Sequence, residues 1–320
     1  MIARKFAAIA VIAALIAASF VVFNRAVNAQ PAPGADSSFA DTDVPMSKTL
    51  AYHLSTNAVG HARGFEGNSD DMWELSGWRY SIYSGTNLAL LTNAVWSTNF
   101  WLAGVKGLCA TCIGYSNGMG GQGLVTMVSP RHFLFATHMH PENQLVAFLD
   151  TNNVLYWRKS LQRADVANDT SVGILNADLP PSVGYMPVLP PDYTNYISMK
   201  DITFVQGIGM NQGMRMFGQP MQLLDRTFVY WSCSRRSPFG LGTNWNVAIR
   251  GGDSSNPEML LIGNQLVLAS HNYSINSGPN YAFQFDAINR QMHNLSKTNR
   301  LKTDYQLTPF SLTNWPVINR

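Results

Sequence analysis

The sequence predicts an all-β protein, built as an antiparallel sandwich or barrel. Short apolar segments follow one another through the middle of the chain, and turn residues such as those at 150–153 separate them. These segments lack the period of a helix, so they are read as strands. The 320 residues, 46% of them hydrophobic, are enough for one large or two small cores. A net charge of +3 is too small to indicate a nucleic-acid partner.

Residues 1–29 have the composition of a targeting segment. Arg4 and Lys5 precede an apolar run of 18 residues, Phe6–Phe23, and small residues at 27–29 suit a cleavage site. Cleavage as a signal peptide is the preferred interpretation, and the protein is then secreted or periplasmic. The run is also close to the length that spans a bilayer, so an anchor formed by residues 6–23 is the alternative. A buried core helix is a third. Membrane contact is expected only if the segment is retained.

The next two regions precede the predicted sheet. Residues 30–46 are rich in Pro, Gly, Ala, Ser and Asp and predict a flexible linker. Residues 47–100 form an N-terminal extension with two predicted helices, near Asp70–Trp78 and Asn87–Leu102. The second places Leu88, Leu91, Val95 and Trp96 near one helical face. The sequence leaves open whether this extension is docked on the sheet or is a pro-segment.

Two sets of strands follow, separated by the proline-containing connection Leu189–Tyr193. The first set is Leu124–Val128, Phe133–Thr137, Gln144–Leu149, Val154–Arg158, Ser171–Leu175 and Val183–Val188. The second is Ile202–Gly209, Arg226–Ser232, Asn244–Ile249, Met259–Ile262, Gln265–Ser270 and Asn280–Phe285. A helix is predicted over Asp286–Leu295, and residues 301–320 form a C-terminal tail.

One turn carries a serine suited to chemistry. In the segment 250–257, glycines present Asp253 and Ser254 just before an apolar strand. A serine hydroxyl needs a base to take its proton, and the base needs a third group to orient it. His138 ends an apolar segment upstream, and Asp169 stands just before another.

These three segments together resemble those of the trypsin/chymotrypsin-like serine peptidases. They read Phe135-Ala-Thr-His138, Asn168-Asp-Thr-Ser-Val-Gly-Ile-Leu175 and Gly252-Asp-Ser-Ser-Asn-Pro257, in the order of that family. The resemblance implies two six-stranded antiparallel barrels and a closing C-terminal helix. Residues 101–190 would be the first barrel and residues 191–300 the second. It also implies hydrolysis of a peptide or protein substrate through an acyl-serine intermediate, without a cofactor.

The resemblance assigns a role to each site residue. Ser254 is the expected nucleophile, and His138 is the general base and then the general acid. Asp169 holds the histidine tautomer and stabilises the imidazolium. The backbone N–H groups of Gly252 and Ser254 form the expected oxyanion hole.

Three other polar residues compete for these roles. His132 and His140 are rivals for the base, and Asp165 is a rival for the acid. His132 follows Pro130 and is expected in a solvated turn. His138 and His140 have the spacing of a metal pair, but no further ligand cluster accompanies them, so no metal is expected.

Substrate contacts are expected at three positions. The base of the specificity pocket falls on Ala248, so no acid there selects Arg or Lys. Ser270 and His271 are further candidates, with His271 placed to contact an acidic substrate residue. Asp253 matches an acid that a newly cut N-terminus neutralises in some members of the family, and its partner is left open.

The motifs also depart from the family pattern. Ser255-Asn256 stands where the family has glycines, and Met139 stands where it often has a cysteine. These departures keep two alternatives open. Beside the peptidase, the alternatives are a catalytically inactive homologue that acts as an exported binding protein and an unrelated β-rich surface protein with chance motifs.

Two smaller motifs receive structural interpretations. The three cysteines are Cys109, Cys112 and Cys233, an odd number that excludes full intrachain pairing. For the Cys109–Cys112 pair, a local disulfide and two buried thiols both stay open. Gly118–Gly123 has the glycine spacing of a dinucleotide loop, but a strand follows it instead of a helix. We interpret it as a turn before a strand.

Overall fold

The computed structural model describes ten segments, all within the compact unit Thr42–Arg320. They are residues 45–62, 73–75, 94–96, 102–116, 122–197, 202–207, 216–221, 228–230, 253–274 and 277–318. Residues 1–29 and nearly all of the predicted linker lie outside them. Within the described segments, no helix combines the length and hydropathy needed to cross a bilayer.

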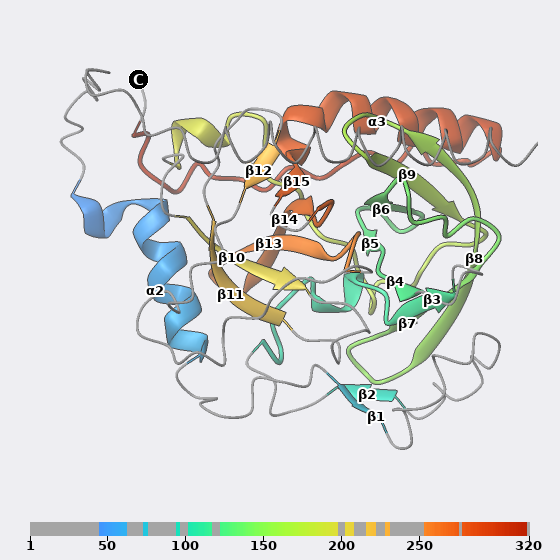
Figure 1. Ribbon diagram of the computed structural model, residues 1–320, viewed down its shortest axis with the longest axis horizontal. Coiled ribbons are helices and arrows are strands. Elements are labelled where there is room, and N and C mark those ends of the chain that lie inside the picture. The colour runs from blue at the N-terminus through green and yellow to red at the C-terminus, as the bar shows by residue number, and fades with distance from the viewer. Residues whose placement is uncertain are drawn as a thin grey trace, which may run out of the picture. The chain divides into compact units, whose positions relative to one another are not determined.

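The described chain is mostly β, with a long helix near its C-terminus (Figure 1), which confirms the coarse prediction. The elements before the proline-containing connection at 189–193 are η1 (Met46–Lys48), α2 (Leu50–Ala62), β1 (Trp73–Leu75), β2 (Ala94–Trp96), η5 (Leu108–Ala110), β3 (Gly114–Ser116), β4 (Gln122–Gly123), β5 (Thr126–Met127), β6 (His132–Ala136), β7 (Leu145–Leu149), β8 (Leu155–Asp165) and β9 (Thr170–Leu175). Those after it are η6 (Tyr193–Asn195), β10 (Ile202–Gly207), β11 (Met216–Met221), β12 (Phe228–Tyr230), β13 (Pro257–Ile262), β14 (Gln265–His271), β15 (Ser277–Pro279) and α3 (Tyr281–Thr298).

The largest sheet is antiparallel and has seven strands in the order β4-β3-β7-β8-β9-β6-β5. The long strand β8 pairs with β7 through its first half and with β9 through its second. A bulge between Ser160 and Gln162 separates the two halves. Bulges bend a strand and increase its twist, so this one helps the sheet to curl. Thr111, just before β3, forms a bridge to Thr126 on β5, which brings the two ends of the sheet together.

Strand β9 is an interior strand of this sheet, next to the central strand β8, and all six of its residues are buried. Strands β8 and β6 flank it, and α3 packs on it. Gly173 on β9 has no room for a side chain, since a Cβ there would lie 2.1 Å from the Phe133 ring. The aromatic ring therefore packs directly on the β9 backbone, which explains a glycine in a central strand.

A second sheet has four strands in the order β11-β10-β13-β14. Helix α2 packs against β10 and β13. Its Asn57 side-chain amide donates to the carbonyls of Leu261 (3.1 Å) and Gly263 (2.8 Å) in the β13–β14 hairpin. Part of the N-terminal extension is therefore docked on the sheet.

The helix predictions in the N-terminal extension are wrong for the residues that the structure describes there, which are 73–75, 94–96 and 102. The segment Asp70–Trp78 contains strand β1, the segment Asn87–Leu102 contains strand β2, and the two strands pair through Trp73 and Trp96. Tryptophan and β-branched residues favour strands, and this preference outweighs the helical spacing. The helix that exists, α2, was not predicted, because only Leu50 and Leu54 mark its buried face among the residues described.

Two strand predictions are also wrong. Val183–Val188 is irregular and forms only bridges at Val188, because Gly184 has a positive φ of 70° and Pro187 lacks an N–H. Asn280–Phe285 belongs to the start of α3. The Asn280 side chain accepts from the N–H groups of Ala282 and Phe283, so Asn280 is the N-cap and the helix begins earlier than predicted. The predicted helix Asp286–Leu295 is confirmed within α3.

Both described cysteines are buried free thiols, so the disulfide interpretation is wrong for the Cys109–Cys112 pair. The N–H of Val125 donates to Cys112 Sγ at 3.1 Å. Burial raises the pKa of each thiol to about 12, which keeps both protonated and unreactive. Cys233 lies outside the described residues.

His132 is not in a solvated turn. It belongs to β6, is fully buried, and contacts Ser129 Oγ (3.1 Å) and Ser296 Oγ of α3 (3.3 Å) through its two ring nitrogens. Burial lowers its pKa from 6.5 to about 4. His132 is thus a neutral core residue that joins α3 to the sheet.

This burial predicts acid sensitivity. The unfolded chain binds a proton at His132 near pH 6.5, but the folded chain binds one only near pH 4. The stabilisation that His132 gives to the folded protein is therefore fully present above pH 6.5 and is lost as the pH falls toward 4. We expect the stability advantage of the wild type over His132→Gln to shrink by about 2 kcal/mol between pH 7 and pH 5, measured by denaturant unfolding. An advantage that stays constant over this range would contradict the assignment.

Candidate active site

Asp169 lies in the tight turn between β8 and β9. Asn168 and Asp169 have positive φ angles of 49° and 60°, and the N–H of Thr170 donates to the Ala167 carbonyl at 2.9 Å. Positive φ at both central residues is the geometry of a type I′ hairpin turn. Asn and Asp tolerate this conformation better than other residues with side chains. The Asn-Asp pair thus makes the turn and also delivers a carboxylate to its tip.

His138 lies two residues beyond the end of strand β6 and faces this turn. Strands β6 and β9 pair with Ala136 opposite Thr170, so the residues just beyond the pair meet. The N–H of Thr137 donates to the Asp169 carbonyl at 2.8 Å, and the N–H of His138 donates to Asp169 Oδ1 at 3.2 Å. The ring Nδ1 of His138 lies 2.5 Å from Asp169 Oδ2.

This contact defines the chemistry that the histidine can perform. A carboxylate only accepts hydrogen bonds, so Nδ1 carries the proton and Nε2 is left as a base. The His138 side chain is 47% exposed, whereas that of Asp169 is 15% exposed. The base therefore reaches solvent and the acid behind it is shielded. The sequence predicted this contact between His138 and Asp169.

Ser254 lies in a turn that is hydrogen-bonded to the end of β6, two residues before His138. The N–H of Asn256 donates to the Asp253 carbonyl at 3.2 Å, which closes a turn with Ser254 and Ser255 at its centre. The N–H of Ala136, two residues before His138, donates to Ser255 Oγ at 2.7 Å. Ser254 itself is partly exposed. The contact of Ser254 Oγ with His138 stays a prediction.

Ser255 departs from the glycine of the family pattern, and the structure shows how its side chain fits. Its φ is 72°, a conformation that favours glycine. Its side chain is buried and is bonded to β6 through the hydroxyl. Asn256 is also buried, and its carbonyl accepts from the N–H of Asn272 at 2.8 Å. Both residues therefore anchor the turn.

Asp165, the rival acid, does not contact His138. Its Oδ1 accepts from Ser171 Oγ at 2.7 Å and lies 3.2 Å from Arg163 Nε. Arg163 also donates to the Thr137 carbonyl at 2.6 Å, next to His138 in the chain. Asp165 therefore supports the site through Arg163.

Arg163 was not identified from the sequence, because a single arginine in a strand matches no motif. Its Nε lies 2.7 Å from Glu142 Oε1, and its Nη1 donates to His140 Nδ1 at 2.9 Å. Arg163 thus contacts the segment before His138, at Thr137, and after it, at His140 and Glu142. His140 is part of this cluster, and no group of three metal-ligating side chains occurs in the described part of the chain.

The predicted substrate contacts Ser270 and His271 are buried in this structure. Ser270 Oγ donates to the His271 carbonyl at 3.2 Å, and His271 Nδ1 contacts the Tyr281 hydroxyl. Burial lowers the pKa of His271 to about 3, so this histidine is neutral. Their burial favours a supporting role over direct contact with substrate. Ala248 and Gly252 lie outside the described residues.

Asp253 and Glu258 complete the polar groups beneath the turn. Asp253 is buried, and its carbonyl accepts from the Asn272 side-chain amide at 3.0 Å. Glu258, in the strand that follows the turn, is fully buried. Burial raises its pKa well above the ordinary value. Burial therefore disfavours a negative charge on Glu258 beneath the serine turn.

No protein-family model matches this chain, and no curated protein matches it by sequence.

The Ser255 hydrogen bond yields a prediction about stability. Ser255→Ala leaves the Ala136 N–H without its acceptor and keeps a side chain at positive φ. We expect a loss of about 1–3 kcal/mol in the free energy of unfolding. Ser255→Gly loses the same hydrogen bond but also removes the strain of a side chain at positive φ. It should therefore be more stable than Ser255→Ala by about 1 kcal/mol. Denaturant unfolding of both variants measures the difference, and equal stabilities would contradict it.

Proposed function

We propose that this protein is an exported serine endopeptidase of the trypsin-like type. The observation that carries the proposal is the contact between His138 Nδ1 and Asp169 Oδ2 at 2.5 Å, beside a serine turn that is bonded to the His138 strand. A base that is oriented by an acid, next to a turn-borne serine, is the arrangement that nucleophilic catalysis requires. The proposed substrate is a peptide or protein, and the reaction uses no cofactor.

The proposed reaction proceeds in two acyl-transfer steps. Ser254 Oγ attacks the substrate carbonyl carbon while His138 Nε2 takes the hydroxyl proton. Asp169 stabilises the imidazolium, and the N–H groups of Gly252 and Ser254 stabilise the oxyanion. The imidazolium then gives its proton to the leaving amine, and the C–N bond breaks to leave acyl-Ser254. Water, activated by the same histidine, attacks the ester and releases the acid and the free serine.

The proposal extends to the architecture. The curled seven-stranded sheet is the first of two barrels, and the sheet that contains β13 and β14 belongs to the second. In this arrangement His138 and Asp169 come from one barrel and Ser254 from the other. The Ser255–Ala136 hydrogen bond crosses between the corresponding sheets and supports this division.

The inactive binding protein is the alternative, and labelling with a fluorophosphonate probe separates the two. The probe phosphonylates an activated serine, so the wild type should be labelled and Ser254→Ala should not. In a peptide-hydrolysis assay, Ser254→Ala and His138→Ala should each lower kcat by about 10^5–10^6-fold. Peptidase activity that persists in Ser254→Ala would remove the assignment, and an unlabelled wild type would favour the binding protein.

Two neighbouring acids provide the matched control for this experiment. Asparagine suits the positive-φ turn, so Asp169→Asn should keep the fold. Its neutral side chain can donate to His138 Nδ1 and thereby favour the wrong tautomer of the histidine, so kcat should fall by about 10^4-fold. Asp165→Asn alters a carboxylate that contacts Arg163 and Ser171, and it should cost much less. Equal losses in the two variants would show that Asp169 has no special role.

A further inference from the structure

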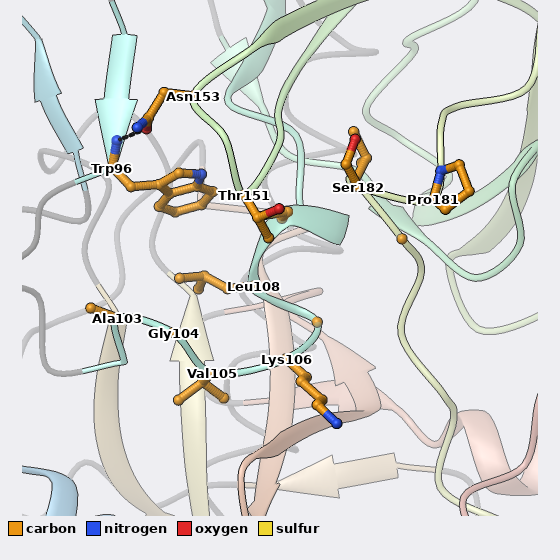
Figure 2. A pocket seen from close by; sticks show the side chains of 14 residues that line it. Trp96, Ala103, Gly104, Val105, Lys106, Leu108, Thr151, Asn153, Pro181 and Ser182 are labelled. Atoms are coloured by element: carbon orange, nitrogen blue, oxygen red, sulfur yellow. Dashed lines mark hydrogen bonds between the residues drawn. The ribbon is translucent and has the colours of Figure 1, made fainter.

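A cavity of about 460 Å³ lies apart from the residues of the candidate active site (Figure 2). Its walls are the loop 103–109, the β7–β8 turn at Thr151 and Asn153, the turn 181–184, and Trp96 of β2. None of these residues belongs to the group proposed for catalysis. The volume lies in the range of sites for small molecules and is too large for a few trapped waters.

Hydrogen bonds fix the loop 103–109, Trp96 and the β7–β8 turn, so these walls of the cavity are formed without a ligand. The N–H of Lys106 donates to the Asn264 carbonyl at 3.1 Å, and Lys106 itself accepts from the N–H of Leu266 at 2.9 Å. Trp96 Nε1 donates to the Asp150 carbonyl at 2.8 Å. The backbone N–H of Trp96 donates to Asn153 Oδ1 at 2.7 Å. A site held in place in this way binds without a large ordering cost.

The cavity offers apolar surface from two sides. Figure 2 shows the Trp96 ring and Leu108 on one side, with Pro181 and Ser182 on the other. Val105 and Val183 add branched side chains to the lining. An aromatic or branched group placed here would contact an indole ring and aliphatic carbons, which favours stacking and burial.

The charge of the lining favours an anion. Lys106 is the charged residue among the described residues that line the cavity, and it is exposed. A flexible ammonium at the rim can turn toward a bound carboxylate. Asp150 does not line the cavity, although it lies close enough for its charge to raise the pKa of Cys109. Asp150 Oδ1 also accepts from the N–H groups of Asn152 and Val154, both at 2.8 Å, which offsets its repulsion of an anion.

We propose that this cavity binds a carboxylate that carries an aromatic or branched aliphatic group, either a free organic acid or the carboxyl end of a peptide. The apolar group lies between Trp96 and Pro181, and the carboxylate faces Lys106 at the rim. The site is independent of the proposed peptidase activity, since it uses none of the residues His138, Asp169 or Ser254.

Calorimetric titration of the full chain with 3-phenylpropionate and with its neutral analogue 3-phenylpropionamide tests this site. The acid should bind more tightly than the amide. Lys106→Met keeps the length of the side chain but removes its charge, and it should weaken binding of the acid by about tenfold and leave the amide unchanged. Lys159→Met changes an exposed lysine on β8 outside the cavity and should alter neither. Ala103→Trp, at an exposed lining position, should block both ligands.

Three results would overturn the proposal: no binding of the acid, equal affinity for acid and amide, or the same loss in Lys106→Met and Lys159→Met. The lysine variants change exposed side chains, so they remain informative even if Ala103→Trp does not fold. Titration with N-acetyl-Gly-Phe, which has a free carboxylate, identifies the source of the ligand. Tighter binding than that of 3-phenylpropionate assigns the site to a peptide end, and weaker or equal binding assigns it to a free acid.

Discussion

The candidate site depends on the positive-φ turn at Asn168-Asp169. This turn lets β8 reverse into β9 within two residues, and it also aims the Asp169 carbonyl and carboxylate at the segment after β6. Asp169 accepts hydrogen bonds from three groups of that segment: the N–H of Thr137, the N–H of His138 and the His138 ring. A single turn therefore sets the backbone and the side-chain tautomer of the base together. The register of β6 on β9 brings the two segments into contact, so sheet pairing underlies the chemistry.

The serine turn is positioned by a different route, across the two main sheets. Strand β13 begins directly after it, in the four-stranded sheet, while Ala136 belongs to the seven-stranded sheet. Ser255 accepts from Ala136 although its backbone is in a conformation suited to glycine. Strain of this kind persists only where the surroundings fix the residue, and here a buried hydrogen bond offsets it. Ser255 stands where the peptidase motif has glycine, and its hydroxyl is the group that joins the Ser254 turn to β6.

The sequence was most informative where structure is local. Strands such as β6 and β9 are apolar runs between turn residues and were predicted as strands. The His138–Asp169 contact was predicted because the segments around both residues resemble peptidase motifs. Sequence-based predictions were wrong where contacts between residues distant in the sequence determine the local structure. Trp96 looks like part of a helical face but pairs with Trp73, and His132 follows a proline but is buried against Ser296 of α3. Arg163 gave no signal, because its role depends on Thr137, Glu142 and Asp165 meeting around it.

The β13–β14 hairpin connects the two candidate sites. Ser254 stands just before β13, and the opposite end of the hairpin turns at Gly263-Asn264, where the Asn264 carbonyl accepts from the N–H of Lys106. Apolar burial on both faces keeps this hairpin stiff: every residue of β13 is buried, and Leu260 and Val267 pack in the cluster with Leu50 and Leu54 of α2. A stiff element that carries the serine turn at one end and a cavity wall at the other couples the positions of both. The docked helix α2 therefore stabilises the hairpin that carries the serine turn and is hydrogen-bonded to the cavity loop at Lys106.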